Sequence, residues 1–278
     1  MTSLVNSISS ASNPQFKIWK SLTTSKGIKE NNQFFLMGEK LVLEFLSEMR
    51  TTGASAGVAA GSSAGLESTY QVEYLIFEAD SESEVFSMAK TKPGIKKALL
   101  SRELFKELDV LGTKAPLLIL SFTDFKEKDF SIAAEGLELI SPLGDPRNMG
   151  ALVRTSLGFG VREIILTKES THPFLPQAIK ASSGAALKIK FSKTSYAISE
   201  IPISGENYAL ALFGENILKT KWPKNLRLWV GEEGPGLQLD HSQKKMMRFV
   251  NIPTTGVESL NAMVSTSLAI WEWRKQQS

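Results

Sequence analysis

The stretch Leu226-Arg227-Leu228-Trp229-Val230-Gly231-Glu232-Glu233-Gly234-Pro235-Gly236-Leu237 decides the fold class. Its first five residues are apolar except for the arginine, which is typical of a short buried strand. Glycines follow directly, and glycine-rich turns at the C-terminal end of a strand expose backbone groups to ligands in open α/β sheets. The stretch therefore predicts a parallel α/β sheet with a binding loop that begins at Gly231.

The same order of strand, turn and helix extends through the second half of the chain. Short buried strands separated by helices predict a parallel sheet that is covered on both faces. Besides Leu226–Val230, strands are expected at Gly136–Ile140, Glu163–Leu166, Leu187–Lys190, Tyr208–Leu212 and Met247–Ile252, and helices at Met149–Phe159 and Leu260–Lys275.

The first half predicts a smaller α/β domain. Strands are expected at Tyr70–Glu78 and Ala115–Ser121, and helices at Gly38–Arg50, Ser83–Ala89 and Ser101–Leu108. The run Thr51–Thr69 is almost entirely Gly, Ala, Ser and Thr, which predicts a flexible surface loop. The charged stretch Phe125–Glu135 is interpreted as a linker, so the sequence predicts two domains, residues 1–130 and 131–278.

Composition excludes several classes of chemistry. The 278 residues carry 32 basic and 29 acidic side chains, which gives a net charge of 32 − 29 = +3. A net charge this small does not by itself indicate a nucleic-acid partner. The absence of cysteine excludes disulfides, thiolate zinc sites and thiol nucleophiles. With only two histidines a histidine-rich metal site is excluded, and no metal is expected. Without a membrane-length apolar run or a signal-peptide pattern, the sequence favours a cytoplasmic protein.

Two kinds of apparent catalytic signal are discounted. Gly53-Ala54-Ser55-Ala56-Gly57 and Gly61-Ser62-Ser63-Ala64-Gly65 match the nucleophile elbow of hydrolases, but both lie in the low-complexity run without the required strand and helix. His172 and His241 are each interpreted as surface residues rather than ligands. Neither signal supports a hydrolase or a metal enzyme.

Two further segments resemble binding loops. In the first, Gly150 lies in an expected first helical turn, where glycine costs about 0.5–1 kcal/mol relative to alanine, so a close approach is expected there. Arg154 follows one turn later on the same face. Asn148 is interpreted either as a helix N-cap or as a site residue. In the second, Ser259 is a plausible N-cap and Asn261, a poor helix former, is expected to have another role.

The three segments together resemble the three signature motifs of the SpoU branch of the SPOUT superfamily, the RNA 2′-O-ribose methyltransferases. The motif N-x-G-x-x-x-R is matched by Asn148, Gly150 and Arg154, the motif G-x-E-G-x-G by Gly231, Glu233, Gly234 and Gly236, and the motif P-x-x-G-x-x-S-L-N by Pro253, Gly256, Ser259, Leu260 and Asn261. Ala181-Ser182-Ser183-Gly184 is similar to a further family element, and Asn13-Pro14 with Phe34–Glu39 resembles the opening of the family's ribosomal-protein-like domain.

The resemblance implies a fold, a cofactor and a partner. The fold is a trefoil-knotted, parallel-sheet SPOUT catalytic domain preceded by a small α/β ribosomal-protein-like domain that binds the RNA substrate. S-adenosyl-L-methionine is implied as cofactor, a homodimer through the catalytic domain is implied, and RNA is the expected substrate, ribosomal RNA rather than tRNA. Leu268, Trp271 and Trp273 are interpreted as either dimer surface or core.

The resemblance also implies site residues. Arg154, Asn148, Glu233, Ser259 and Asn261 are implied in catalysis, Gly231, Ile252, Leu260, Phe213 and Gly214 in cofactor binding, and Lys17, Lys26 and Lys29 in phosphate contacts. A guanidinium rarely releases its proton, so Arg154 is expected to stabilise the forming 2′-oxyanion, with an RNA phosphate or water accepting the proton. Three alternatives remain open from sequence: a tRNA 2′-O-methyltransferase, a non-catalytic RNA-binding relative of the same fold, and an unrelated α/β nucleotide-binding enzyme.

Overall fold

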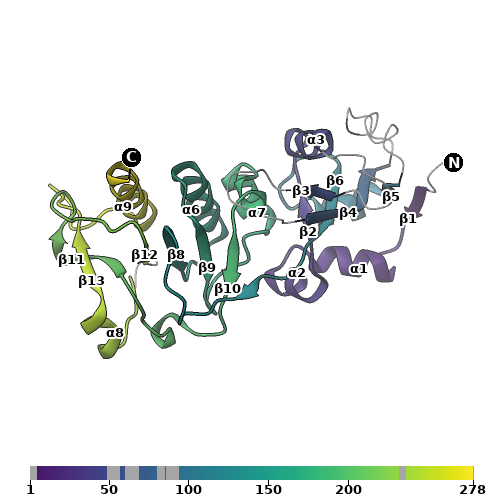
Figure 1. The fold of residues 1–278 in the computed structure, drawn as a ribbon. Helices are drawn as coiled ribbons and strands as arrows, with labels where there is room; N and C mark the ends of the chain where they lie inside the picture. The colour runs from purple at the N-terminus through teal and green to yellow at the C-terminus, as the bar shows by residue number, and fades with distance from the viewer. Residues whose placement is uncertain are drawn as a thin grey trace. The chain divides into compact units, whose positions relative to one another are not determined.

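The computed structural model describes residues 5–48, 57–59, 69–79, 85, 94–231 and 236–277. These residues form two compact units. The first contains the described chain up to Asp124 together with His172–Leu187, and the second contains Phe125–Thr171 and the described residues from Lys188 onward. Each unit has its own sheet (Figure 1).

The first unit is built on a mixed sheet with strand order β1-β5-β4-β6-β2, to which β3 is added beside β4. Its strands are β1 (Val5–Ile8), β2 (Gln33–Leu36), β3 (Gly57–Ala59), β4 (Thr69–Glu78), β5 (Lys96–Leu100) and β6 (Leu117–Ser121). Its helices are α1 (Pro14–Ser21), α2 (Ser25–Asn31), α3 (Glu39–Glu48), α5 (Arg102–Leu108) and α7 (Pro176–Ser182), followed by the short 3-10 helix η1 (Ala185–Leu187). Ser101 caps α5 as expected, because its side chain accepts a hydrogen bond from the Leu104 amide.

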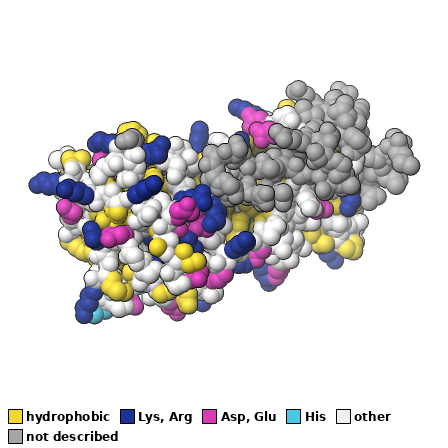
Figure 2. Space-filling view, viewed as in Figure 1, with side chains coloured by type: hydrophobic (Ala, Val, Ile, Leu, Met, Phe, Trp, Pro, Cys, Tyr) yellow, Lys and Arg dark blue, Asp and Glu magenta, His cyan; other side chains and the backbone are white. Residues whose placement is uncertain are grey.

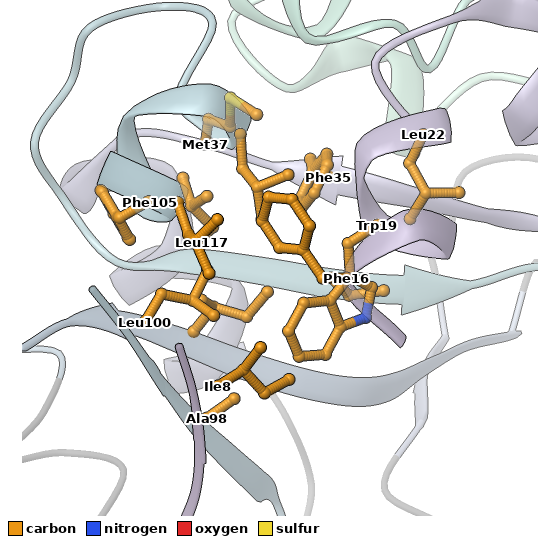
Figure 3. Packing of buried hydrophobic residues seen from close by; sticks show 14 residues of the cluster. Ile8, Phe16, Trp19, Leu22, Phe35, Met37, Ala98, Leu100, Phe105 and Leu117 are labelled. Atoms are coloured by element: carbon orange, nitrogen blue, oxygen red, sulfur yellow. The ribbon is translucent and has the colours of Figure 1, made fainter. Parts of the chain in front are cut away.

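The polar, lysine-rich start of the chain folds into two helices that the sequence did not reveal. Phe16 and Trp19 of α1 are fully buried in the core of the first unit (Figure 3). Gly27 of α2 lies so close to the end of α1 that a Cβ atom there would be 2.1 Å from the Ser21 carbonyl oxygen. Only glycine permits this approach of the two helices.

His172 is buried, with 2% of its surface exposed, so the expectation of a surface residue is wrong. Its ring lies 5.6 Å from that of Phe122, and its Nδ1 accepts a hydrogen bond from the Phe174 amide. His241 is exposed at the start of a short helix, as expected. Most of the helix expected at Ser83–Ala89 and most of Thr51–Thr69 lie outside the described residues. The same holds for the first elbow-like pentapeptide except Gly57, and for the whole of the second.

The second unit contains a parallel sheet with strand order β13-β11-β12-β8-β9-β10-β7. Its strands are β7 (Lys126–Glu127), β8 (Leu137–Ser141), β9 (Glu163–Leu166), β10 (Phe191–Lys193), β11 (Asn207–Asn216), β12 (Leu226–Trp229) and β13 (Arg248–Asn251). Its helices are α6 (Pro146–Phe159), α8 (His241–Met246), α9 (Ala262–Gln276) and the 3-10 helix η2 (Ile198–Glu200). Helices α6 and α9 pack side by side (Figure 1).

The strand expected at Leu187–Lys190 is displaced in the structure. Leu187 ends η1, and pairing with β9 begins only at Phe191. Leu187 and Ile189 are buried and Lys188 is exposed, so burial alternates along the expected segment although these residues are not in a paired strand. Alternating burial alone therefore did not locate the paired strand.

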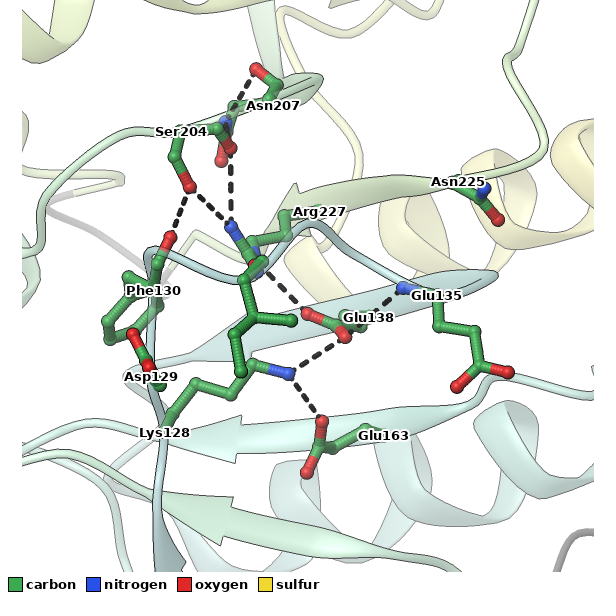
Figure 4. Close-up of polar contacts among 12 residues, drawn as sticks. Lys128, Asp129, Phe130, Glu135, Glu138, Glu163, Ser204, Asn207, Asn225 and Arg227 are labelled. Atoms are coloured by element: carbon green, nitrogen blue, oxygen red, sulfur yellow. Dashed lines mark hydrogen bonds and ion pairs between the residues drawn. The ribbon is translucent and has the colours of Figure 1, made fainter.

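The expected linker Phe125–Glu135 is anchored to the second unit by buried charges (Figure 4). Lys128 Nζ lies 2.8 Å from Glu138 Oε1 and 2.6 Å from Glu163 Oε2. Arg227 Nε donates to Glu138 Oε2 at 3.0 Å, and the same guanidinium donates to the Ile132 carbonyl. Lys128 of this segment is therefore paired inside the second unit, while the domain boundary after residue 130 stays a prediction.

Lys128 is expected to contribute strongly to stability. Burial alone would raise the pKa of Glu163, but hydrogen bonds and charges from Lys128 and Lys190 outweigh it and hold the pKa below its usual range. Breaking a buried pair costs about 3–5 kcal/mol. Because Lys190 and Arg227 remain, we expect Lys128→Met to lower the free energy of unfolding by about 3 kcal/mol near neutral pH.

The pH dependence of this loss has a defined sign. A carboxylate with a lowered pKa stabilises the fold above its unfolded pKa of about 4.3, and that contribution fades as pH falls through the folded value. The free energies of unfolding of wild type and Lys128→Met, measured in urea titrations, should therefore come closer together below about pH 4. Lys20→Met is the matched control, since it breaks an exposed pair with Glu107 and should cost under about 1 kcal/mol. Equal losses in the two variants would contradict this account.

Candidate functional site

A cavity of about 550 Å³ in the second unit opens beside the middle of β11, where its neighbouring strands β12 and β13 end. Four segments line it: Leu210–Leu212 in β11, the chain after β12, the end of β13, and the start of α9. Carboxyl ends of parallel strands meet at one edge of a sheet, which explains why segments distant in sequence converge here. The lining residues are Leu210, Ala211, Leu212, Gly231, Gly236, Leu237, Val250, Asn251, Ile252, Thr254, Ser259, Leu260, Asn261, Ala262, Ser265 and Thr266.

The structure brings the second and third motif segments together in this cavity. Gly231, Ile252 and Leu260, the first three residues implied in cofactor binding, all line it. Ser259 and Asn261, implied in catalysis, line it as well. Glu233 lies outside the described residues. The sequence therefore identified the loops that form the cavity correctly.

Phe213 and Gly214 do not line the cavity, so their implied role in cofactor binding stays a prediction. Pairing between β11 and β13 shifts register between Leu210 and Glu215, so this part of β11 bulges. The bulge places Leu210–Leu212 on the cavity instead, while Phe213 is 77% exposed. At Gly214 a Cβ atom would lie 2.4 Å from the Val250 nitrogen, so close backbone packing explains the glycine.

The start of α9 differs from the sequence expectation. Helix α9 begins at Ala262, and Asn261 is its N-cap, with Oδ1 accepting from the amides of Met263 at 2.9 Å and Val264 at 3.3 Å. The expectation that Ser259 caps this helix is therefore wrong. Asn261 has a structural role that explains why this residue stands there, and its position on the cavity is compatible with a second role.

The first motif segment forms the beginning of α6. Asp145 is the N-cap, and its side chain accepts from the amides of Arg147 and Asn148, both at 2.9 Å. Asn148 is thus not the cap, and its side chain is half-buried without being needed to begin the helix. Arg154 is exposed on α6 and forms no ion pair with another described residue. Neither Asn148 nor Arg154 is among the cavity-lining residues, so the expected convergence holds for two of the three segments.

The lysines implied in RNA contacts lie on the helices of the first unit. Lys17 is exposed on α1, and Lys26 and Lys29 are exposed on α2. Lys26 Nζ is 3.7 Å from Glu30 Oε1 in an exposed pair, which leaves it available to other anions. Figure 2 shows lysine and arginine side chains interspersed with acidic ones on the visible described surface, so phosphate contacts would be local.

Leu268 and Trp271 of α9 are surface residues, with 39% and 46% of their areas exposed, whereas Trp273 is core. Trp273 is 5% exposed, and its Nε1 donates to the Pro223 and Lys224 carbonyls. The exposed pair belongs to an apolar groove of about 400 Å³ lined by Phe159, Met263, Val264, Ser267, Leu268 and Trp271.

The cavity suits a small organic cofactor better than a metal. Its volume falls within the about 300–1,000 Å³ of small-molecule sites, and it combines apolar side chains with strand-end backbone. The described lining residues include no charged side chain, which fits an adenine ring recognised by backbone groups. In the described ranges no cluster of three or more potential metal ligands is found. None of the described helices has the length and apolar character of a membrane span.

Known proteins are similar to this chain in sequence and in fold. The model of the SpoU rRNA Methylase family matches residues 139–271. Ribosomal RNA small subunit methyltransferase G 2 of Syntrophobacter fumaroxidans is 34% identical over 177 residues, 63% of this chain, and the chain spans about a third (34%) of that relative's length. 23S rRNA (guanosine(2553)-2′-O)-methyltransferase RlmP of Bacillus subtilis is 27% identical over 96% of this chain and 98% of its own.

The fold is that of solved SpoU enzymes. The methyltransferase AviRb of Streptomyces viridochromogenes, solved in complex with AdoMet, superposes with a TM-score of 0.74 over 95% of this chain and 98% of its own at 15% identity. That likeness shows the α/β fold with its parallel sheet. Together with the cavity formed by the second and third motif segments, the match shows that residues 139–271 belong to the SpoU rRNA methylase family.

Proposed function

We propose that this protein is an S-adenosylmethionine-dependent RNA 2′-O-ribose methyltransferase that acts on ribosomal RNA. The observation that carries the proposal is the cavity beside β11 at the ends of β12 and β13, because the two C-terminal family motifs meet there. The names of relatives such as RlmP favour ribosomal RNA over tRNA. The proposal includes the cytoplasm as the place where the protein acts. The trefoil knot and the RNA-binding role of the first unit are part of the same proposal.

Different residues would bind the cofactor and position the substrate. Gly231 and Ile252, which follow β12 and β13, and Leu260, which precedes α9, would hold the adenosine part through their backbone groups. When bound, S-adenosylmethionine supplies an electrophilic methyl group on a sulfonium. Ser259 and Asn261 would position the substrate ribose at the mouth of the cavity, with Asn148 and Glu233 supporting the arrangement.

Arg154 would stabilise the nucleophile. A ribose hydroxyl is a weak nucleophile near neutral pH, and its oxygen gains negative charge as the proton leaves. A guanidinium can stabilise this charge by charge-assisted hydrogen bonds. Its pKa above about 12 makes it a poor general base, so a phosphate of the RNA or water would accept the proton.

A homodimer belongs to the proposal, because α6 and α9 leave an apolar groove exposed. Val264, Leu268 and Trp271 contribute most of that exposed apolar surface. We expect Trp271→Glu to shift the protein towards monomer in sedimentation velocity, since burial of a new charge opposes association. Lys275→Glu, exposed on the same helix but outside the groove, is the control. A Trp271→Glu protein that sediments as wild type would exclude this face as the interface.

Transfer of labelled methyl groups tests the activity. The protein is incubated with S-adenosylmethionine labelled in its methyl group and with unmethylated ribosomal RNA or tRNA, and incorporation is counted. We expect label in ribosomal RNA. If calorimetry shows cofactor binding but no label is transferred, the protein is a non-catalytic relative. If calorimetry shows no cofactor binding, the protein is a different α/β enzyme.

A further inference from the structure

Strand β11 bulges where it passes the cavity. It lies beside β13 at one edge of the sheet (Figure 1). Leu210 and Glu215 of β11 both align with Val250 of β13, so residues 211–214 form a bulge without aligned partners in that strand. Such a bulge interrupts the ladder of main-chain hydrogen bonds. Because residues 210–212 line the cavity, one of its walls is built largely from chain that the pairing with β13 does not hold.

Asn251, the last residue of β13, holds the chain within the bulge and again after it. Its side-chain Nδ2 donates a hydrogen bond to the Leu212 carbonyl oxygen, inside the bulge. Its main-chain carbonyl oxygen accepts from the amide of Ile217 at 2.8 Å, where regular pairing has resumed. Asn251 also lines the cavity. It is therefore placed to fix the bulge relative to the cavity.

The other contacts of the bulge are less directional. The ring of Phe213 rests on that of Phe249, with their centres 4.8 Å apart, but most of its surface is exposed. Gly214 packs closely on the backbone of β13 and has no side chain to hold it there. Within the described part of the chain, Asn251 provides the one side-chain hydrogen bond to the bulge. Ordering a backbone residue costs about 1–2 kcal/mol, so this bond is expected to matter for a segment of four residues.

We infer that Asn251 is a positioning residue for the cofactor, because its side-chain amide keeps the bulge on the cavity before S-adenosylmethionine binds. A site that is ordered in advance spares the ligand the cost of ordering it. With a loose bulge, the apparent affinity falls in proportion to the fraction of molecules in the competent conformation. The chemical step after binding does not change. The inference rests on the proposed function, because its ligand is the cofactor proposed there.

Asn251→Leu tests this role, because leucine has nearly the shape of asparagine but cannot donate a hydrogen bond. Calorimetry on the full chain should show S-adenosylmethionine binding about three- to tenfold weaker than in wild type, which is about 0.7–1.4 kcal/mol at 1.4 kcal/mol per tenfold. Asn251→Gln keeps an amide donor and should recover part of the affinity. With saturating cofactor, both variants should transfer methyl groups to ribosomal RNA at the wild-type rate.

A second readout needs no cofactor. Chymotrypsin cleaves after phenylalanine, and the exposed Phe213 lies in the bulge. Cleavage follows the population of the locally open form when the segment recloses faster than it is cut. We expect cofactor-free Asn251→Leu to be cleaved after Phe213 severalfold faster than wild type, with the fragments identified by mass spectrometry. Asn251→Gln should be cleaved at a rate between the two.

Asn216→Ala is the matched control. Asn216 of β11 is aligned with Asn251, and its Oδ1 accepts from the Leu218 amide at 2.9 Å, but it does not line the cavity. The variant therefore loses a similar hydrogen bond in the same strand pair. Its cofactor affinity and its cleavage after Phe213 should equal those of wild type. Equal losses in Asn216→Ala and Asn251→Leu would overturn the inference, because general loosening of the strand pair would then explain both.

The remaining outcomes separate this inference from the proposed function. Wild-type affinity in Asn251→Leu, with folding checked by thermal unfolding, would overturn the inference. Weaker binding without faster cleavage would also overturn it, because Asn251 would then contact the cofactor instead of holding the bulge. If Asn251→Leu does not fold, Asn251→Ala takes its place with the same expectations. Wild-type protein that binds no S-adenosylmethionine would overturn the proposed function, whereas the cleavage rates would still show whether Asn251 holds the bulge.

Discussion

Ala262→Trp is expected to abolish binding of S-adenosylmethionine. Ala262 begins α9 and lines the cavity where the second and third motif segments meet. An indole at this position would occupy space that the cofactor needs, while the Asn261 cap before it is retained. Calorimetry should show an affinity at least about 100-fold weaker than wild type, which corresponds to about 2.8 kcal/mol.

The control for this prediction adds the same ring elsewhere on the same helix. Lys275→Trp lies on the exposed last turn of α9, outside the cavity, and should bind the cofactor as wild type does. Thermal unfolding of both variants checks that the second unit remains folded. If the folded Ala262→Trp protein bound the cofactor with wild-type affinity, this cavity would not be the cofactor site.

Arg154→Ala is expected to lower the single-turnover rate of methyl transfer by about 10²–10³, the loss typical of removing one stabilising donor from a developing oxyanion. Cofactor affinity should not change, because Arg154 does not line the cavity of its own chain. Arg154→Lys should recover part of the rate, since an ammonium keeps the charge but lacks the planar fork. Quenched-flow assays with saturating cofactor measure the chemical step.

Arg147→Ala is the matched control, because Arg147 is exposed on the first turn of the same helix. Near wild-type chemistry in Arg154→Ala would exclude Arg154 from the mechanism. Mixed dimers of Arg154→Ala and Ala262→Trp further locate the arginine. Activity recovered on mixing shows that Arg154 of one copy serves the cavity of the other, and activity that stays lost shows that both must belong to one chain.

Local patterns predicted those parts of the fold whose determinants are local. Glu163–Leu166 was predicted as a strand with its bounds as the structure has them, and Ser101 was recognised as a cap. The second and third motif segments were placed correctly at strand ends, because a buried run followed by glycines defines such an end in the sequence itself.

The features that escaped prediction depend on distant partners. The charges of Phe125–Glu135 suggested a solvated linker, yet Lys128 and the Ile132 carbonyl bind buried groups of the sheet. The many lysines around Phe16 and Trp19 suggested a polar segment, so the burial of these two residues in the core of the first unit was not predicted. The spacing of residues within a segment does not reveal contacts with distant residues, because the burial of a segment depends on what packs against it.

The same distinction between local signals and distant contacts applies to the candidate site. Gly231, Ile252 and Leu260 could be identified because their motifs have distinctive residue types. Ala262, Ser265 and Thr266 line the same cavity but have no chemical signature in the sequence, so only the geometry of α9 shows them. Phe213 and Gly214 lie outside the cavity, because a register shift in β11, which cannot be seen without its partner strand, places Leu210–Leu212 there.

The position of the transferred methyl group tests the central claim most directly. After reaction with ribosomal RNA and labelled cofactor, the RNA is hydrolysed with alkali, which cleaves next to every free 2′-hydroxyl but not next to a methylated one. The account predicts that the label is recovered in an alkali-resistant dinucleotide from a single position in the RNA. Label recovered in mononucleotides would place the methyl group on a base and contradict a cavity built for a ribose oxygen.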